Sequence, residues 1–480
     1  MPQQPQHPVV QTQAGTVRGL RDPFGDLYRA IPYAMAPQGA RRFAAPVPHP
    51  GWPGIRAATE PAPTAPQPAR PFGRLDMTPY FGPGWVPGAE YLAVDVRTPA
   101  ADGEKRPVMV FVHGGGFVSG SNRAALYDGK AFARDGVVLV TVNYRVGIPG
   151  FLDLPGAPAN RGLLDVLAAL RWVRDSISSF GGDPGNVTVF GQSAGATIVG
   201  ALLAAPEAAG LFHRAIVQSG TGTGAFTPEQ AERVTAAAAT ALGIRASVEQ
   251  FAAIPDEHLL AILPKLAGLD LRTATARDPL LGLSPFSLVL PVQPADALAD
   301  GPAAEVSVLI GDNIEEGNLY LVPQGKLEPS TEDDVLALAA AGYADPGATV
   351  AAVKAARPTA HPGELRSALL GEALFGAGTT RMAEAHSRIS GRRTYAYSFA
   401  QRSTALDGRL GATHTTELPY VFDLADEPWL HGDSGLLGPD PAPEGLAEAM
   451  HGAWIAFARD GDPGWAAYDP EQPVVRVFGD

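Results

Sequence analysis

A glycine-flanked serine between an apolar run and an apolar helical stretch constrains this chain more than any other feature. The run is 186–190 (NVTVF), and Gly191-Gln192-Ser193-Ala194-Gly195 follows it directly. Glycines at both ends of such a turn let a strand and a helix approach closely around a strained central residue. The pattern predicts that the Ser193 hydroxyl is exposed at the carboxyl end of a buried strand. It would lie beside a helix N-terminus, whose dipole favours negative charge.

Other apolar runs extend this arrangement along the chain. The runs typical of buried strands are 108–112, 137–143, 214–220, 306–311 and 393–399. Helical patterns separate them, most clearly at 162–180, where the apolar residues share one face. Strands that alternate with helices predict an α/β fold with a large, mostly parallel sheet. A small hairpin is expected at 9–20 and a mainly helical insertion at 225–280.

Composition narrows the classes of function. The chain has 36 basic and 50 acidic residues among 480, a net charge of −14, which argues against nucleic acid or an anionic membrane as a partner. It contains no cysteine, which excludes disulfides, thiol nucleophiles and zinc–thiolate sites. The sequence shows no membrane span and no secretory signal. We expect a cytoplasmic protein without membrane insertion, although secretion of a processed form is compatible with the same sequence.

A second glycine-rich turn, His113-Gly114-Gly115-Gly116, follows the run 108–112. Glycines here allow backbone N–H groups to face a cavity instead of a neighbouring strand. We therefore predict that the N–H groups of Gly115, Gly116 and Ala194 form an oxyanion hole. A phosphate-binding loop is the alternative interpretation. The pattern disfavours it, because neither this run nor the glycines near 220–224 completes G-x-G-x-x-G.

A serine nucleophile needs a base and a carboxylate that orients the base. Three carboxylates follow the run 306–311: Asp312, Glu315 and Glu316. Position alone favours Asp312, which ends the strand, but the residues themselves leave all three open. Among the later histidines, His414 lies in a loop beyond the last clear strand, where it could reach over the sheet edge. His414 is therefore the predicted base.

Several longer motifs resemble those of the type-B carboxylesterases, the family that includes cholinesterases and bacterial para-nitrobenzyl esterases. They are AIPYA (30–34), HGGGFVSGS (113–121), NYRVGIPGFL (143–152), FGGDPGNVTVFGQSAGA (180–196), FHRAIVQSG (212–220), IEEGNLY (314–320) and HTTELPYVF (414–422). The resemblance covers nearly the whole chain. It implies one α/β-hydrolase domain over 1–480, with insertions at about 60–90, 222–304 and 322–390 that form a lid or gorge.

The resemblance also implies roles for individual residues. It identifies Glu316 as the acid of a triad with Ser193 and His414. The polar groups implied around this triad are Gln192, Ser219 and Glu417. Two positions depart from the family pattern: Gln192 precedes the serine, where Glu is common, and Thr415 follows the histidine, where Gly or Ala is usual. The expected substrate pocket includes Tyr80, Phe81, Phe117, Phe286 and Leu288.

The implied activity is hydrolysis of small to medium neutral carboxylic esters, such as p-nitrophenyl, p-nitrobenzyl or aryl esters, through an acyl-enzyme. No metal or organic cofactor is expected, and the protein is expected to be a monomer or weak homodimer. The alternatives are the same triad acting on carbamates, amides or polyester- and phthalate-type esters. A non-catalytic binding protein is a further alternative, disfavoured because Ser193, Glu316 and His414 are all present.

Overall fold

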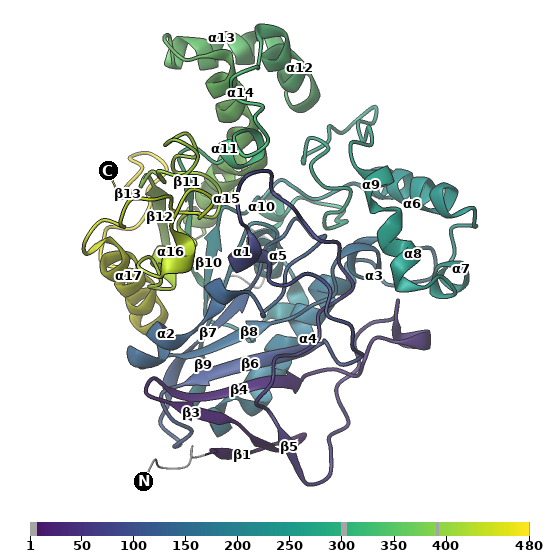
Figure 1. The fold of residues 1–480 in the computed structure, drawn as a ribbon, viewed down its shortest axis with the longest axis vertical. Coiled ribbons are helices and arrows are strands. Elements are labelled where there is room, and N and C mark those ends of the chain that lie inside the picture. Colours follow the sequence, from purple (N-terminus) through teal and green to yellow (C-terminus); the bar gives the residue numbers. More distant parts are fainter. Residues whose placement is uncertain (1–6, 299–304, 390–392, 480) are drawn as a thin grey trace.

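The structure is a computed structural model that describes residues 7–298, 305–389 and 393–479. Its centre is a ten-stranded sheet in the order β13-β12-β11-β10-β9-β7-β8-β6-β4-β3 (Figure 1). The strands of this sheet are β3 (Leu20–Asp22), β4 (Gly25–Pro32), β6 (Ala93–Thr98), β7 (Arg106–Val112), β8 (Val138–Val142), β9 (Gly182–Gln192), β10 (Arg214–Gln218), β11 (Ser307–Asn313), β12 (Thr394–Phe399) and β13 (Val475–Phe478).

The sheet is parallel from β8 to β13, and β6, β4 and β3 add antiparallel strands at its other edge. A separate three-stranded sheet joins β1 (Val9–Thr12), β2 (Gly15–Arg18) and β5 (Ile55–Ala57). Because β7, β9, β11 and β12 run in the same direction, their carboxyl ends meet along one edge. The loops that follow these strands are therefore brought together there.

Helices cover both faces of the sheet (Figure 1). Their bounds are α1 (Thr78–Phe81), α2 (Lys130–Arg134), α3 (Gly147–Phe151), α4 (Arg161–Ser176), α5 (Ala194–Leu203), α6 (Pro228–Leu242), α7 (Val248–Ala252), α8 (Asp256–Ala261), α9 (Leu263–Leu266), α10 (Pro294–Ala297), α11 (Asn318–Leu321), α12 (Glu332–Gly342), α13 (Pro346–Ala356), α14 (Pro362–Gly371), α15 (Ala377–Ser387), α16 (Leu418–Val421) and α17 (Leu446–Asp460). Helices α4, α5 and α15 pack in the hydrophobic cluster on one face, and α2, α16 and α17 pack in the cluster on the other.

Strand β7 shows why the central runs are apolar throughout. Val108, Val110 and Val112 belong to one hydrophobic cluster, whereas Met109 and Phe111 belong to the other. Successive side chains of a strand point to opposite faces, so a strand covered on both faces must be apolar at every position. This is the physical reason for the continuous runs in the sequence.

The predicted α/β fold with a large, mostly parallel sheet is confirmed, and the strands expected from the apolar runs are present as β7 to β12. The predicted hairpin is β1–β2, and the predicted helix at 162–180 is α4 followed by one turn of 3-10 helix. The mainly helical insertion expected at 225–280 is only partly helical. Helices α6 to α9 end at Leu266, and the chain has no helix or strand from 267 to 293.

The segments predicted as insertions are built differently from one another. Segment 60–90 is mostly loop and contains only α1. Segment 222–304 holds α6 to α10, and its residues 299–304 lie outside the described residues. Segment 322–390 holds α12 to α15, and α12 to α14 project at one end of the molecule (Figure 1).

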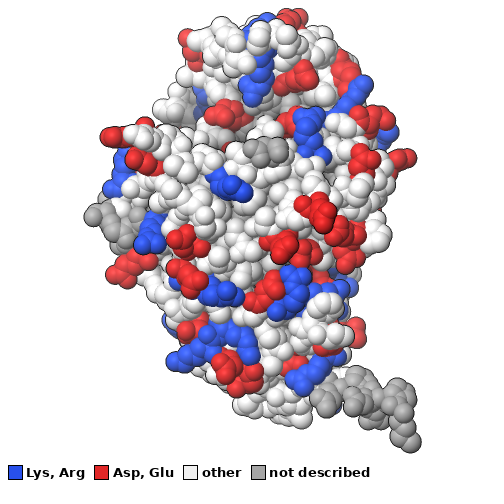
Figure 2. Space-filling model, turned by 90° about the vertical axis from the view of Figure 1, so that its left-hand side faces the viewer, with Lys and Arg blue, Asp and Glu red and all other residues white. Residues whose placement is uncertain are grey.

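Charged side chains of both signs are spread over the surface, and some of them form ion pairs. Acidic and basic residues are interspersed over the face drawn in Figure 2. Exposed pairs of this kind include Arg174 with Asp175 and Arg233 with Glu229. Within the described part of the chain, no helix combines the length and the apolar character needed to cross a lipid bilayer.

One ion pair is fully buried beneath this surface. Arg145 donates to both oxygens of Asp165, from Nη2 at 2.7 Å and from Nε at 2.8 Å. The remaining guanidinium nitrogen donates to the carbonyls of Arg42 and Ala44, and the side chains of both ions have no exposed surface. The pair joins the loop after β8 and the N-terminal segment to α4.

We expect Asp165→Asn to lower the free energy of unfolding by about 3–5 kcal/mol, because it leaves the Arg145 cation buried without a counter-charge. Denaturant titration of the purified variant measures this change. Asp175→Asn is the matched control, since it breaks an exposed pair and should cost less than about 1 kcal/mol. Equal losses in the two variants would contradict the structural role given to the buried pair.

Candidate active site

The nucleophile turn connects β9 to α5 as the sequence predicts. Ser193 adopts φ 58° and ψ −126°, and its N–H donates to the Gln218 carbonyl at 2.9 Å. A Cβ atom on Gly195 would lie 2.0 Å from the Val112 carbonyl oxygen, and one on Gly191 would lie 2.7 Å from Gly195. Only glycine fits at these two positions, so helix, strand and turn can meet closely enough to present the hydroxyl.

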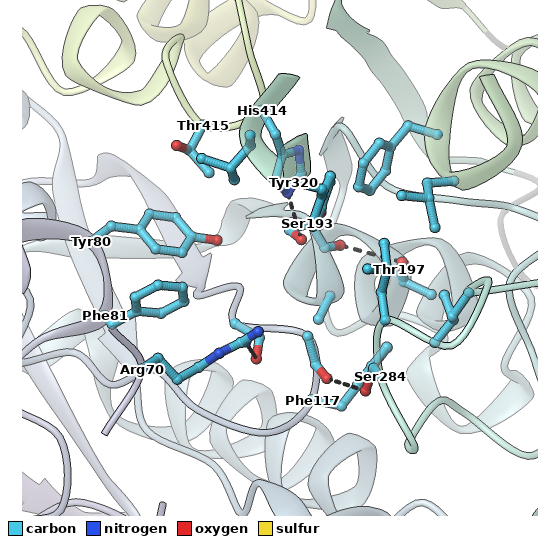
Figure 3. Close-up of a pocket in the computed structure, with 18 of the residues that line it drawn as sticks. Arg70, Tyr80, Phe81, Phe117, Ser193, Thr197, Ser284, Tyr320, His414 and Thr415 are labelled. Carbon is cyan, nitrogen blue, oxygen red and sulfur yellow. Dashed lines mark hydrogen bonds between the residues drawn. The ribbon is translucent and has the colours of Figure 1, made fainter. Parts of the chain in front are cut away.

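Three side chains from three loops form a hydrogen-bonded chain at this turn. His414 Nε2 lies 2.8 Å from Ser193 Oγ (Figure 3). On the other side of the ring, His414 Nδ1 lies 2.6 Å from Glu316 Oε2. The carboxylate accepts, so Nδ1 carries the proton and Nε2 is free to accept the serine proton. The second Glu316 oxygen accepts from the Asn313 N–H at 2.9 Å. The side chains of Ser193, His414 and Glu316 are all buried.

The structure distinguishes the three candidate acids. Glu316 is the carboxylate bonded to His414. Glu315 instead pairs with Arg402 and accepts from the Ala412 N–H. Asp312, which position alone favoured, is part of strand β11 and makes no hydrogen bond to His414. Burial, together with the neighbouring charges of Glu316 and Glu372, raises the pKa of Asp312 to about 8.

The glycine-rich loop after β7 lies against the same turn. Gly115 and Gly116 have φ of 119° and 62°, and both line the cavity with Ser193 and Ala194. Among the described residues, none accepts a hydrogen bond from the N–H groups of Gly115, Gly116 or Ala194. The Gly115 carbonyl, in contrast, accepts from the N–H groups of Val118 and Ser119. The N–H groups of this site are therefore free to donate hydrogen bonds, as an oxyanion hole requires.

His113 anchors this loop from behind. Its Nδ1 donates to the Gly114 carbonyl at 2.8 Å, and its ring stacks on Tyr144 with centroids 4.3 Å apart. Burial lowers the pKa of His113 to about 4, so the ring is neutral at pH 7. The residue is part of the support of the glycine turn and does not reach Ser193.

The cavity in front of Ser193 contains about 660 Å³ of space, part of it open to solvent. Of the predicted pocket residues, Tyr80, Phe81 and Phe117 line it (Figure 3). Phe286 and Leu288 do not line it; both are buried where the chain pairs with 224–226. The lining residues that the sequence analysis missed are Arg70, Phe72, Thr197, Thr221, Leu280, Leu283, Ser284, Leu319, Tyr320, Leu374 and Phe375.

Comparison with known proteins matches this geometry to a family. A model of the carboxylesterase family matches residues 6–475. The chain is 34% identical to a phenmedipham hydrolase of Pseudarthrobacter oxydans and 33% identical to a para-nitrobenzyl esterase of Bacillus subtilis, covering 98% of this chain and 95% of each relative. The chain belongs to the carboxylesterase family. Its activity class is therefore that of a carboxylic ester hydrolase.

A solved structure agrees in fold over the same extent. The carboxylesterase EST55 of Geobacillus stearothermophilus at pH 6.2 superposes with a TM-score of 0.84 at 35% identity, covering 98% of this chain and 96% of that one. The α/β-hydrolase fold of the carboxylesterases is thus the fold of this chain. In the described ranges, no group of three or more His, Asp or Glu side chains is arranged to hold a metal ion.

The polar groups expected around the triad of this carboxylesterase lie in different relations to it. The side-chain oxygen of Gln192, Oε1, accepts a hydrogen bond from the Tyr80 hydroxyl at 2.6 Å. Its side-chain nitrogen, Nε2, lies 3.5 Å from His414 Nε2, which is too far for a strong hydrogen bond. Glu417 accepts from Asn313 Nδ2 at 2.8 Å, and burial together with Glu316 raises the pKa of Glu417 to about 7. The Ser219 hydroxyl is buried and has no hydrogen-bond partner in the described structure.

Asn313 and Phe375 support the triad and were not found from the sequence. The N–H of Asn313 donates to Glu316, and its side-chain amide donates to both Glu417 and the Thr413 carbonyl. It thereby joins the acid loop to the histidine loop. Phe375 stacks on the His414 ring at a centroid distance of 4.3 Å and an interplanar angle of 14°. The position of Asn313, two residues beyond the predicted strand 306–311, is a signal that could have found it.

We expect the Asp312→Asn variant of this carboxylesterase to be more stable than the parent above about pH 5, by a margin that grows toward pH 8. The folded carboxyl has its pKa near 8, whereas an unfolded aspartate ionises near pH 4. The folded state therefore binds the proton more tightly, and stability due to this group is lost as pH rises from about 4 to about 8. The asparagine cannot ionise and avoids that loss.

Thermal melting of both proteins from pH 5 to pH 9 measures the difference in Tm. The control is Asp175→Asn, an exposed carboxylate whose effect should not change across this range. A difference between Asp312→Asn and the parent that stays constant with pH would show that Asp312 does not titrate in this way.

Proposed function

We propose that this chain is a serine esterase that hydrolyses small to medium neutral carboxylic esters through an acyl-enzyme on Ser193. The observation that carries the proposal is the continuous chain Ser193–His414–Glu316, with bonds of 2.8 and 2.6 Å. The cavity beside it is lined largely by aromatic and aliphatic side chains, which suits neutral acyl and alcohol groups. We further propose that 1–480 act as one domain, whose inserted segments line this cavity.

In the first half-reaction Ser193 Oγ attacks the ester carbonyl carbon while its proton passes to His414 Nε2. Glu316 holds the ring by its Nδ1–H and stabilises the imidazolium that forms. The oxyanion is accepted by the N–H groups of Gly115, Gly116 and Ala194, each such donor being worth about 3 kcal/mol. The intermediate then collapses, the ester C–O bond breaks, and the alcohol leaves with the proton from His414.

In the second half-reaction water replaces the alcohol. His414 takes a proton from the water as its oxygen attacks the acyl carbonyl. The tetrahedral intermediate collapses, the bond to Ser193 Oγ breaks, and Oγ regains the proton from His414. The acid product leaves and the enzyme is restored. No step in this sequence uses a group other than the residues named and water.

We expect Ser193→Ala to abolish labelling by a fluorophosphonate probe and to lower kcat for p-nitrophenyl butyrate by about 10⁴-fold or more. Glu316→Gln should lower kcat by about 10⁴-fold while leaving the serine in place, because it disturbs the histidine tautomer. Peptide mapping by mass spectrometry locates the label, and Ser178→Ala, at an exposed serine in the 3-10 turn after α4, is the control. Active parent protein that carries no label on Ser193 would overturn the proposal.

The same experiment separates this function from a non-catalytic binding role. A well-folded parent protein that hydrolyses no short p-nitrophenyl ester would favour the binding role. Turnover that disappears in Ser193→Ala would exclude it. The complete triad and the three free N–H donors support the catalytic alternative.

Carbamates are the second candidate class of substrate, favoured by the relative named phenmedipham hydrolase at 34% identity. Attack of Ser193 on a carbamate carbonyl needs the same base and the same oxyanion donors, so leaving group and pocket shape decide. We expect kcat/KM for phenyl carbamates to be measurable and lower than for matched phenyl esters. A panel of such pairs that includes phenmedipham tests this, and complete absence of carbamate turnover would remove the candidate.

We also propose that the protein is cytoplasmic and acts as a monomer or weak homodimer. Its lack of cysteine fits a reducing compartment, where disulfides are rare. Light scattering across a range of protein concentrations measures the oligomeric state, and fractionation of the producing cells measures the location.

A further inference from the structure

The cavity before Ser193 contains one strongly basic side chain, Arg70. It comes from the loop segment 60–90, and Figure 3 shows it on the side of the cavity where Phe81 lies. None of the residues that line this cavity is Asp or Glu. The charge is notable because the chain has 50 acidic residues against 36 basic ones.

The guanidinium is held beside the oxyanion loop. Arg70 Nη1 donates to the Gly115 carbonyl at 3.0 Å and lies 3.5 Å from Ser119 Oγ. A Cβ atom built on Gly116 would lie 3.4 Å from the same Nη1 atom. The guanidinium carbon is 5.2 Å from the centre of the Phe81 ring, a cation–π distance. The cation is therefore fixed in position next to the N–H groups that would bind the oxyanion.

These contacts leave most of the guanidinium without a partner. Both hydrogen bonds of Arg70 come from Nη1, and neither Nε nor Nη2 donates to an acceptor in the described residues. No carboxylate of the described chain forms an ion pair with it, unlike Arg145 with Asp165. Burial lowers the pKa of Arg70, but arginine remains charged at neutral pH. Arg70 is only partly buried, and a bound anion would give its free nitrogens a charge-assisted hydrogen-bond partner within the cavity.

We propose that Arg70 binds a carboxylate carried by the ester substrate, so that this site accepts half-esters of dicarboxylic acids and related carboxylate-bearing esters besides neutral ones. The inference rests on the proposed serine esterase function. Guanidinium N–H groups match the two oxygens of a carboxylate, and the free Nε and Nη2 are the pair that can bind it bidentately. With a net charge of −14 the protein repels anions at long range, so this contact must act locally within the cavity.

The test compares two substrates that differ only in charge. One is the mono-p-nitrophenyl ester of glutaric acid, and the other is the matching p-nitrophenyl ester in which a primary amide replaces the free carboxylate. The measured quantity is the ratio of their kcat/KM values at pH 7.5. Loss of the Gly115 contact in an Arg70 variant affects both substrates, because both react at the same ester, and therefore cancels in the ratio.

We expect Arg70→Met to lower the carboxylate-to-amide ratio by about 10–100-fold, the usual effect of one charge-assisted hydrogen bond. The loss should lie mainly in KM for the carboxylate substrate. Arg70→Lys, which keeps the charge without the planar fork, should give an intermediate ratio. Arg171→Met is the control, since Arg171 is an exposed residue of α4 outside the cavity, and its ratio should equal that of the parent.

A ratio in Arg70→Met within about 3-fold of the parent would overturn the inference and leave Arg70 as a support of the Gly115 loop. Competitive inhibition of the parent protein supplies a second measurement that needs no variant. Valerate should inhibit p-nitrophenyl butyrate hydrolysis at least 10-fold more strongly than valeramide, and equal inhibition would count against carboxylate binding.

Two further comparisons complete the design. A pair of butyrate esters of 4-hydroxybenzoate and 4-hydroxybenzamide places the charge on the alcohol side, so the pair with the larger Arg70 effect shows which half of the ester reaches the guanidinium. If the folded parent hydrolyses neither these compounds nor any neutral ester, the proposed esterase function itself fails. Failure of the Arg70 inference alone leaves neutral ester hydrolysis intact.

Discussion

The close approach of Gly195 to the Val112 carbonyl, where a Cβ atom would lie only 2.0 Å away, is the constraint on which the site depends. It brings the start of α5 against the end of β7 and forces Ser193 into its φ of 58°. The same approach places the Ala194 N–H next to the Gly115–Gly116 turn, which leaves β7 at that point. The Ser193 hydroxyl and the N–H groups proposed as oxyanion donors are thus positioned by one backbone contact between the start of α5 and the end of β7.

The rest of the triad is added from strands further along the sheet. β11 delivers Asn313 and Glu316, and His414 follows β12 at a greater distance along the chain. Asn313 compensates for that distance, because its side chain bonds the Thr413 carbonyl at 2.6 Å and so holds the histidine loop to the acid loop. Phe375, from the inserted helices, then covers the histidine ring. The sheet sets the order of the groups, and loop contacts set their exact separation.

Sequence patterns predicted the strands correctly where burial alone determines their composition. Apolar runs revealed β7 to β12, because burial on both faces favours apolar residues at successive positions. They missed β4 and β6, since Asp26 and Arg97 interrupt those strands. Both charges are buried and paired: Asp26 with Arg21, five residues away on β3, and Arg97 with Asp22, 75 residues away in the sequence. A charge looks unfavourable for a strand until its counter-ion is known, and the pairing of Arg97 with so distant a residue is not visible in the sequence around it.

The pocket was harder to predict for the same reason. Besides residues of the predicted motifs, its lining comes from segments 60–90, 267–293 and 318–376, which only the fold brings together. Phe286 was expected there because it is aromatic and near the right position, but two residues of displacement decide whether a loop side chain faces the cavity. Arg70 carried no motif at all. Its significance lies in the absence of a carboxylate around it within the described structure, a property of its surroundings and not of its own sequence.

Part of the backbone strain lies around the cavity before Ser193. Ten described residues other than glycine have positive φ, and Phe117, Ser193 and Thr415 among them line the cavity. Each such conformation costs about 1–3 kcal/mol and persists only where the surroundings fix it. Thr415, at φ 82°, occupies the position where the family pattern has Gly or Ala, and of these residues only glycine adopts this conformation freely. The threonine adopts the strained conformation and places its side chain in the lining of the cavity beside His414.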